Sequence, residues 1–511
     1  MDSASNQWLL CHNSLAKKDI KLRGGDFGME NFTRRIAVKG LHGRISFDVS
    51  LNPDLNIIYG KNGLGKTTLL HIIANISDGD LYRFYHLNFS EIIIESNSGN
   101  ILILNKNEGI VSVSLDGDAV FSYGGHVETT QSNYQKLALG DVGDTIRKIF
   151  GGRSCYLPAF RSVLERSREI YGASTEEARG PNYDELVRIE ELIQARGAVK
   201  SNTYYSRDLA ARNTALKTIR CRAWFGAMVP VIRYPSIADV AEGLSEEWSS
   251  ANIRTSRLEQ DQYEQAFLDI FEAILLERNT TSPESLTSDG DVGSQNDILS
   301  SISDLLNDET LKTRSDRTSK TYDRLLDIAR AAGREGTKYN SVLEIYRKLL
   351  KTRKETREEA YKPLVDFEAA VNTFLDGKEL RVGFDGDPAN RRASRGERVR
   401  IYPDQGKSYP VRALSSGERQ IATILFAASR SSVTPGSLLI DEPELSLHVD
   451  WQRHILKELI KQNPDRQIIA CTHSPEVGAD HKKSILFFRP TVFEASSDEL
   501  SDEDLLGGDS E

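Results

Sequence analysis

The segment GKNGLGKTT, from Gly60 to Thr68, decides the fold of this chain. It fits the pattern G-x-x-x-x-G-K-[ST] without a mismatch, and it lies between an apolar run, Asn56 to Tyr59, and a helix-like run, Thr67 to Ala74. A strand, a glycine-rich loop and a helix in this order surround the phosphates of a nucleotide with backbone N–H groups and a helix N-terminus. The segment therefore predicts binding of a nucleoside triphosphate.

Two side chains of this loop have distinct predicted roles. Lys66 supplies a mobile positive charge to the phosphates, and the hydroxyl of Thr67 is a ligand for Mg²⁺. ATP and Mg²⁺ are therefore the expected cofactors. The residues expected to contact the nucleotide are Gly60, Asn62, Gly63, Gly65, Lys66, Thr67 and Thr68.

A second segment, SLLIDEPELSLH from Ser437 to His448, ends an apolar strand with two acids. One carboxylate of such a pair holds the Mg²⁺ shell, while its neighbour polarises the water that attacks in line. We assign Asp441 to the metal and Glu442 to the role of catalytic base. These roles require the two segments to meet in space.

The motif set resembles the ABC ATPase superfamily. LSSGERQ, from Leu414 to Gln420, is similar to the LSGGQ signature, and His473 after Ile468-Ile-Ala-Cys-Thr is similar to the switch histidine. The resemblance implies that Ser415 and Gly417 contact the γ-phosphate held by a second protomer, so that ATP bridges a head-to-head homodimer. It also implies that His473 contacts the γ-phosphate and is catalytic together with Lys66 and Glu442.

Some residues depart from the transporter pattern, in which glycine, glutamine and aspartate stand where this chain has Ser416, Glu418 and His448. The stretch DEPELSLH is instead similar to soluble ABC-like ATPases of the SMC, RecF and OLD type. Two further stretches, Ile36 to Phe47 and Tyr156 to Arg161, resemble the ATPase subunits of antiphage systems such as Septu and PARIS. The resemblance covers roughly residues 30–165 and 380–490.

The expected fold is α/β, with an ABC-type ATPase head and a large helical insertion. The head combines a P-loop parallel sheet with an antiparallel β lobe. Apolar residues alternate in three short runs, as expected for that lobe: Ser90 to Glu95, Asn100 to Asn105 and Gly109 to Leu115. The expected divisions are 1–160 and 381–490 for the two halves of the head, 161–380 for the insertion and 491–511 for a disordered acidic tail.

The insertion is predicted to be helical because apolar positions recur three or four residues apart. No heptad pattern persists over several turns, so a long SMC-type coiled coil is not expected. The runs with helical spacing are Glu185 to Arg196, Ser256 to Arg278, Thr321 to Arg330 and Tyr339 to Phe374.

The magnesium-sensing glutamine of the superfamily is expected in the polar, loop-like stretch from Val120 to Gly140. Gln131 and Gln135 are the candidates, and Gln135 is our choice as a metal ligand. No local motif supports either one.

The 511-residue chain has a net charge of −10, but eight acids lie in residues 491–511, without which the charge is −2. The tail is either a solubilising end or a segment that docks to a basic partner or mimics nucleic acid. Scattered cysteines indicate neither a disulfide framework nor a zinc site. No run approaches the roughly 18 apolar residues of a membrane span. We expect a cytoplasmic protein without membrane association.

Two basic sets offer contacts to a nucleic-acid backbone, or else form solvated faces or protomer contacts. Arg161 could bind a phosphate, lie at an interface or be paired structurally. His448 could lie at the dimer seam or cap the helix Val449 to Gln462. The basic sets are Arg207, Arg212, Lys217, Arg220 and Arg222, and Arg391, Arg392, Arg395, Arg398 and Arg400.

The expected function follows from the family resemblance and from what the chain lacks. OLD-type proteins carry a Toprim nuclease after the ATPase, but here only the acidic tail follows the last apolar run, Ser484 to Phe488. We therefore expect an ATP-binding and hydrolysing ABC-like ATPase without its own nuclease domain, which assembles through ATP-bridged dimers or higher oligomers. It is expected to act as sensor, regulator and scaffold for a separate effector nuclease in a bacterial antiviral defence complex. Two alternatives are a RecF/SMC-like ATP-dependent DNA clamp in repair and a scaffold that holds ATP as a structural ligand.

Overall fold

The computed structural model describes residues 31–124, 141–161, 204–279, 298, 300–302, 304–305, 340–383, 398–429 and 436–493. The chain forms two compact units. The first unit contains residues 1–234 and 423–511, and the second contains residues 235–422. The division falls inside helix α12 (Ser416–Ser429), so the signature segment belongs to the second unit.

A five-stranded parallel sheet forms the centre of the first unit. Its strands are apolar and largely buried, as expected for a parallel sheet covered on its faces. The strand that precedes His473 has two neighbours in the sheet. One is the strand that leads into the phosphate loop, and the other is the strand that ends at the acid pair. In spatial order the strands are β14 (Ile485–Phe487), β3 (Leu55–Tyr59), β13 (Ile468–Thr472), β12 (Leu438–Asp441) and β8 (Cys155–Leu157).

Helix α2 (Lys66–Asp78) packs against β8, β12 and β13 and buries nearly all its side chains. Its apolar residues, from Leu69 to Ile76, cover a broad arc of the helix, which favours burial. Helix α4 (Asp141–Ile149) contacts α2. Further described helices of this unit are α7 (Tyr204–Phe225), α13 (Val449–Gln462) and the short η1 (Leu81–His86) and η7 (Lys482–Ser484).

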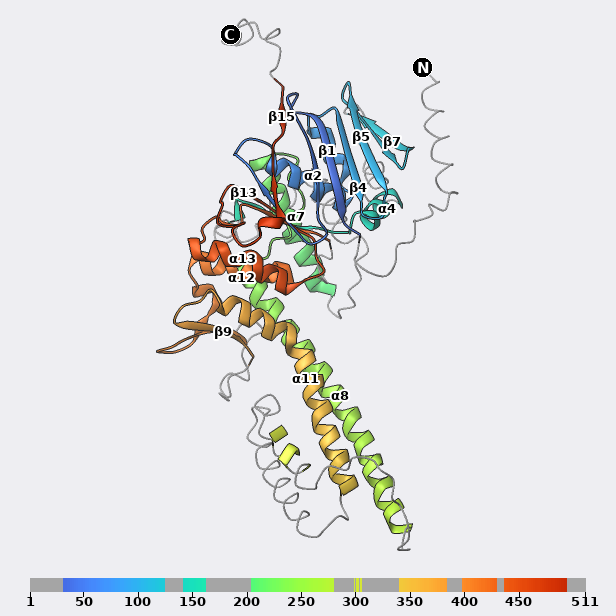
Figure 1. Cartoon of the computed structure of the whole chain (residues 1–511), viewed down its shortest axis with the longest axis vertical. Helices are drawn as coiled ribbons and strands as arrows, with labels where there is room; N and C mark the ends of the chain where they lie inside the picture. Colours follow the sequence, from blue (N-terminus) through green and yellow to red (C-terminus); the bar gives the residue numbers. More distant parts are fainter. Residues whose placement is uncertain are drawn as a thin grey trace, which may run out of the picture. The chain divides into compact units, whose positions relative to one another are not determined.

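A seven-stranded antiparallel sheet forms the expected β lobe (Figure 1). The three runs with alternating apolar residues are all strands, and the predicted fold class is confirmed. Residues 118–124 correct one expectation, because the start of the presumed loop is a strand in which Tyr123 is buried. The order is β15 (Thr491–Val492), β2 (Ile45–Ser50), β1 (Thr33–Leu41), β4 (Glu91–Ser96), β5 (Ile101–Asn107), β6 (Ile110–Leu115) and β7 (Asp118–Gly124).

Buried ion pairs hold the C-terminal end of α2. Asp78 pairs with Arg233 at 2.8 Å, and Asp80 pairs with Arg222 at 3.2 Å. Lys217 donates to the carbonyl of Tyr234 at 2.7 Å. Two members of the first basic set thus have structural partners inside the unit, because α7 turns these side chains inward. The side chains of Arg207 and Arg212 lie outside the described residues.

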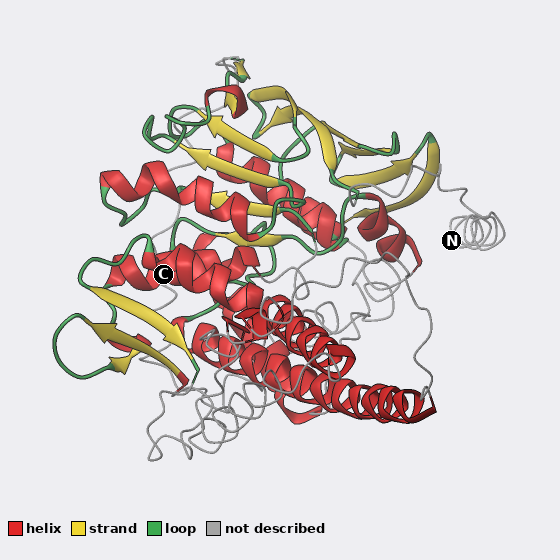
Figure 2. Cartoon of the chain, turned by 60° about the horizontal axis from the view of Figure 1, so that its bottom comes forward, coloured by secondary structure: helices red, strands yellow, loops and turns green. Residues whose placement is uncertain are grey.

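The second unit contains two long helices, α8 (Ile237–Asn279) and α11 (Asn340–Asn372), which run side by side (Figures 1 and 2). The pairs Asn252–Tyr361 and Glu259–Arg353 show that they are antiparallel. With a rise of 1.5 Å per residue, α8 is roughly 65 Å long. The expected helices at Ser256 to Arg278 and Tyr339 to Phe374 are confirmed, whereas 185–196 and 321–330 lie outside the described residues.

A three-stranded antiparallel sheet lies at the base of this helical pair, since both helices contact β9. Two arginines of the second basic set bond within the unit. Arg398 lies over the ring of Trp248, 5.1 Å from its centroid, and Arg400 donates to the carbonyl of Ser408 at 2.7 Å. The other three lie outside the described residues. The elements are β9 (Lys378–Val382), β10 (Val399–Pro403), β11 (Tyr409–Pro410) and η6 (Val411–Ala413).

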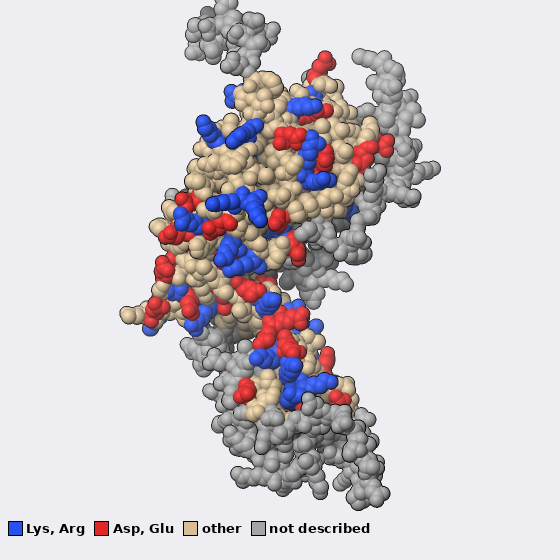
Figure 3. Space-filling model, in the orientation of Figure 1, with Lys and Arg blue, Asp and Glu red and all other residues tan. Residues whose placement is uncertain are grey.

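Charged residues are mixed along the helical pair. On the face drawn in Figure 3, acidic and basic side chains are interspersed and do not form a field of one sign. Throughout the described part of the chain, no helix combines the length and the apolar character needed to cross a bilayer.

Candidate functional site

The phosphate loop joins β3 to α2 with a backbone that its glycines make possible. Gly63 has φ of 79° and Gly65, at the N-cap of α2, has φ of 96°, a left-handed region that glycine enters without a steric penalty. The first turn of α2 carries no acidic residue. The positive end of the helix dipole is therefore available to an anion such as a phosphate.

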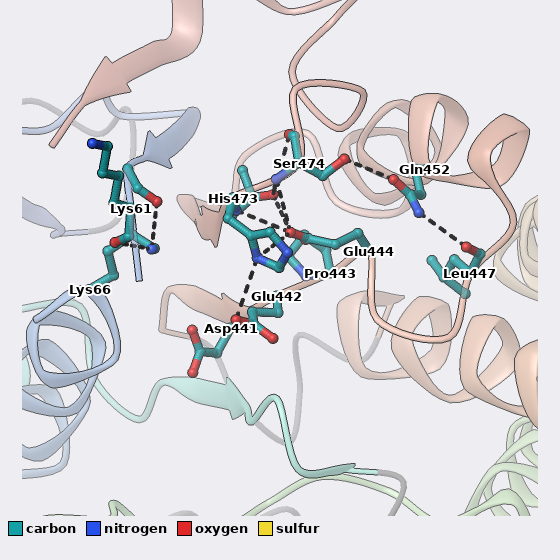
Figure 4. Close-up of polar contacts among 12 residues, drawn as sticks. Lys61, Lys66, Asp441, Glu442, Pro443, Glu444, Leu447, Gln452, His473 and Ser474 are labelled. Carbon is teal, nitrogen blue, oxygen red and sulfur yellow. Dashed lines mark hydrogen bonds and ion pairs between the residues drawn. The ribbon is translucent and has the colours of Figure 1, made fainter. Parts of the chain in front are cut away.

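Lys66 lies against this loop. Its side chain is buried, and its Nζ donates to the carbonyls of Gly60 at 2.7 Å and Lys61 at 2.9 Å (Figure 4). The ammonium is thus held beside the backbone that would surround a phosphate. Its charge suits phosphate binding, as the motif predicts.

The phosphate loop and the acid pair are in direct contact, since the Thr67 hydroxyl donates to Asp441 Oδ2 at 2.8 Å. The pKa of Asp441 is raised to about 6, chiefly by burial and also by the nearby Glu442 carboxylate, while the Thr67 hydroxyl, Arg161 and Lys66 act in the opposite direction. A buried carboxylate with a raised pKa is stabilised in its charged form by a cation.

The residues present fit Mg²⁺. Among the described residues, no group of three or more His, Cys, Asp and Glu side chains could hold a metal by itself. Mg²⁺ with a nucleotide needs no such group, because it takes one or two protein oxygens and completes its shell with phosphates and water. Thr67 and Asp441 would supply those protein oxygens.

Arg161 holds the turn that follows β12. Its guanidinium is 1% exposed and donates to the carbonyls of Asp441 at 2.9 Å and Glu442 at 2.8 Å. Burial lowers the pKa of Arg161, although nearby Tyr234 and the acids of the turn counteract this. The alternative of structural pairing therefore applies to Arg161, since a side chain this buried cannot reach a phosphate in solvent or at an interface.

Glu442 has an unusual backbone for a non-glycine residue, with φ of 50°. Its N–H donates to the Cys471 carbonyl at 2.8 Å, and its carbonyl accepts from Arg161. The left-handed conformation costs roughly 1–2 kcal/mol, and these two bonds offset that cost. The carboxylate remains 27% exposed, so water can reach the predicted base.

His473 follows β13 and faces the acids of the turn at the end of β12, residues 441–444, which we call the Walker B turn. Its Nδ1 lies 3.5 Å from Glu442 Oε1 and 3.3 Å from Glu444 Oε1 (Figure 4). The topology explains this proximity, because β13 is the neighbour of both β3 and β12. The structure thus brings the predicted switch histidine to the predicted base.

The signature segment has its own local geometry in the second unit. The Ser415 N–H donates to Glu418 Oε2 at 2.9 Å, and the Glu418 N–H donates to Ser415 Oγ at 3.4 Å. These reciprocal bonds form a capping box at the start of α12. Lys378 of β9 pairs with Glu418 at 2.8 Å. Burial would raise the pKa of Glu418, but the hydrogen bonds from Lys378 and Ser415 outweigh burial and lower it.

The structure describes His448 but neither candidate for the magnesium-sensing glutamine. His448 occupies the N-cap position of α13 without a side-chain capping bond, and its exposed Nδ1 lies 3.3 Å from Asp450 Oδ2. Gln131 and Gln135 lie outside the described residues, so the choice of Gln135 remains a prediction.

The sequence analysis missed Glu444 and Lys378. Glu444 lies three residues after Asp441, is 7% exposed and contacts the loop that carries His473. The repeated acid in Asp-Glu-Pro-Glu was the available signal. For Lys378, the sequence offered no signal, because its partner is 40 positions away.

Comparisons with known proteins match part of the chain. The family model described as "AAA domain, putative AbiEii toxin, Type IV TA system" matches residues 256–480. A curated relative, "Retron Ec83 probable ATPase" from Escherichia coli, is 30% identical over 168 residues, which are 30% of this chain and 29% of the relative. The match therefore spans less than a third of that protein.

Solved structures overlap the chain more loosely. An Smc head domain with an extended coiled coil, bound to the C-terminal domain of ScpA and derived from Pyrococcus furiosus, covers 88% of this chain and 92% of its own, with 13% identity and a TM-score of 0.34. The recombination mediator RecF covers 88% of this chain and 95% of its own, with 12% identity and a TM-score of 0.31. At such TM-scores neither likeness carries an argument.

Proposed function

We propose that this chain, an ABC-like AAA ATPase of the SMC, RecF and OLD type, hydrolyses ATP at the site formed by the phosphate loop, the acid pair and His473. Lys66 neutralises charge on the phosphates, and Glu442 accepts a proton from the attacking water. His473 contacts the γ-phosphate. Bound Mg²⁺, next to Thr67 and Asp441, supplies further neutralisation of phosphate charge.

One observation carries this proposal: the contact of Thr67 with Asp441 and of His473 with Glu442 around adjacent strand ends. In open α/β sheets, ligands bind outside the carboxyl ends of the parallel strands. The phosphate loop, the metal-side acid, the base and the histidine all follow such ends. Their arrangement matches the division of labour that phosphoryl transfer to water requires.

We propose further that ATP joins two copies of the chain. Ser415 and Gly417 lie at the start of α12, whose first turn also carries Glu418, an acid paired with Lys378. In the proposed homodimer, this end of one copy contacts the γ-phosphate held by the other. Hydrolysis would then open the dimer.

The proposed biological role is to regulate and scaffold a separate effector, a nuclease, in a bacterial antiviral defence complex. The relative named as a retron ATPase supports this role, as does the match to a domain described with a toxin of a type IV toxin–antitoxin system. The antiparallel pair α8 and α11 offers an elongated surface for such a partner.

The test is to express the chain with its neighbouring genes, purify it by a tag and size what co-elutes with and without ATP. The proposal predicts a nuclease-like protein in stoichiometric amount. If the chain elutes alone and binds duplex DNA only in the presence of ATP, a DNA clamp replaces the proposed role.

A further inference from the structure

We infer that Glu444 is a positioning residue for His473, an inference that rests on the proposed function of the site. Glu444 is the third acid of Asp-Glu-Pro-Glu and is buried, with 7% of its surface exposed. Its Oε1 accepts from Thr472 Oγ1 at 2.6 Å, from the His473 N–H at 3.1 Å and from the Ser474 N–H at 3.2 Å. One carboxylate oxygen therefore gathers three donors of the loop that carries the histidine (Figure 4).

The imidazole itself is oriented by the same carboxylate. His473 Nδ1 lies 3.3 Å from Glu444 Oε1 and 3.5 Å from Glu442 Oε1. An ionised carboxylate can accept hydrogen bonds but cannot donate them. The position of Nδ1 beside two carboxylate oxygens therefore favours a hydrogen on Nδ1. Rotating the ring by half a turn would place carbon against these oxygens. Nε2 is therefore left on the opposite edge of a ring that is 48% exposed.

The position of Glu444 in the chain links this orientation to the base. Pro443, with its restricted backbone, separates Glu442 from Glu444, and Arg161 holds the carbonyls on either side of the base. The Walker B turn thus fixes both the base and the loop of the histidine. In metal sites, carboxylates that orient a ligating imidazole typically contribute about 10–100-fold to affinity or activity, and we take the same range for Glu444.

The second partner of the loop supports a specific role for Glu444. Ser474 Oγ donates to Gln452 Oε1 at 2.9 Å, and Gln452 Nε2 donates to the Leu447 carbonyl at 3.1 Å. These bonds tie the loop to α13 and do not involve the imidazole of His473. Glu444 is thus the contact that both holds the loop and faces the ring.

The experiment is a double-mutant cycle in the full chain. We would measure kcat, KM and equilibrium binding of ATP and ADP for the wild type, E444Q, H473A and the combined variant. Glutamine preserves the shape of Glu444 and can keep its oxygen toward the three donors, since Oε2 accepts no hydrogen bond from the described residues, but it removes the negative charge beside Nδ1 of His473. We expect E444Q to lower kcat by about 10–100-fold with little change in KM, and to add nothing when His473 is already alanine.

The matched control is E458Q, because Glu458 is a comparably buried acid on α13 that pairs with Lys461 outside the site. It should leave kcat unchanged. E444D, which retains the charge but is one methylene shorter, should give an intermediate kcat, and it replaces E444Q in the cycle if E444Q does not fold.

Two results would overturn the inference: a kcat for E444Q equal to that of E458Q, or losses from E444Q and H473A that multiply in the combined variant. The proposed function fails in a different way. In that case the wild type does not hydrolyse ATP, and H473A and E442Q change nothing.

Discussion

Replacing Arg161 with methionine should destabilise the first unit and slow ATP hydrolysis together. Arg161 is fully buried and donates to three carbonyls of the Walker B turn, two of them at the short distances of 2.8 and 2.9 Å and the third at 3.3 Å. Methionine fills a similar volume but leaves those carbonyls without their donor. Each hydrogen bond from a charged group contributes about 1.5–3 kcal/mol, which gives about 3–6 kcal/mol for the two short bonds. The cost of burying the guanidinium offsets part of this, so we expect a loss of about 3 kcal/mol.

Activity should fall as well, because the base depends on the same turn. Glu442 keeps its φ of 50° while Arg161 holds its carbonyl. If the turn relaxes by as little as about 1.4 kcal/mol, the population with an aligned base falls about tenfold. R161K keeps the charge but offers one nitrogen in place of a fork, so its loss should be intermediate.

The assay is urea denaturation followed by circular dichroism, with steady-state ATP hydrolysis measured below the unfolding transition. R35M is the matched control, since Arg35 pairs with Asp48 and Glu95 at 2.6 Å but is 38% exposed. An exposed arginine of this kind contributes about 0–1 kcal/mol. Equal urea midpoints for R161M and R35M, with equal ATPase rates, would refute the structural role of Arg161.

Three further predictions concern the base, a buried histidine and the signature. E442Q should bind ATP but hydrolyse it at least about 100-fold more slowly; unchanged hydrolysis would reject Glu442 as the base. Burial lowers the pKa of His71 to about 3, so between pH 6.5 and about 3 only the unfolded chain binds this proton. As the pH falls through this range, the free energy of unfolding should therefore decrease by up to about 1.4 kcal/mol per pH unit. This part of the slope should be absent in H71Q, and an identical slope would contradict the argument. K378M removes the ion pair with Glu418 and should weaken ATP-driven dimerisation in light-scattering measurements, while E379Q, at an exposed neighbouring position on β9, should not.

Local patterns in the sequence predicted most of the elements that build the site. The phosphate loop, the acid pair and the strands of the β lobe follow from short motifs and from period-two alternation, which depend on neighbours along the chain. Helices α8 and α11 were predicted for the same reason. The prediction of a loop from Val120 was wrong for its first residues, which belong to strand β7. Tyr123 of this strand is buried and donates to the carbonyl of Leu81, a contact that no local pattern encodes.

The contacts that arrange the site were less predictable. The sequence gives no order for the parallel strands, so it could not show that β13 separates β3 from β12. Arg161 reaches carbonyls 280 and 281 positions away. Lys217 and Arg222 looked like a basic face, but their partners lie on other segments of the first unit.

Glu418 shows the opposite case, in which a local signal was present but was interpreted only against the family pattern. Ser-x-x-Glu at a helix start predicts a capping box, and the structure has that box at Ser415 and Glu418. The departure from the usual glutamine therefore has a physical role at the start of α12.

The central claim is that the Walker motifs and His473 form one ATP-hydrolysing centre. Its most direct test is phosphate release from ATP by the purified full chain, compared across the wild type, K66A, E442Q and H473A in the presence of Mg²⁺. The account predicts hydrolysis by the wild type, loss of nucleotide binding in K66A, and retained binding with hydrolysis reduced at least about 100-fold in E442Q. Equal rates in the wild type, E442Q and H473A would contradict it.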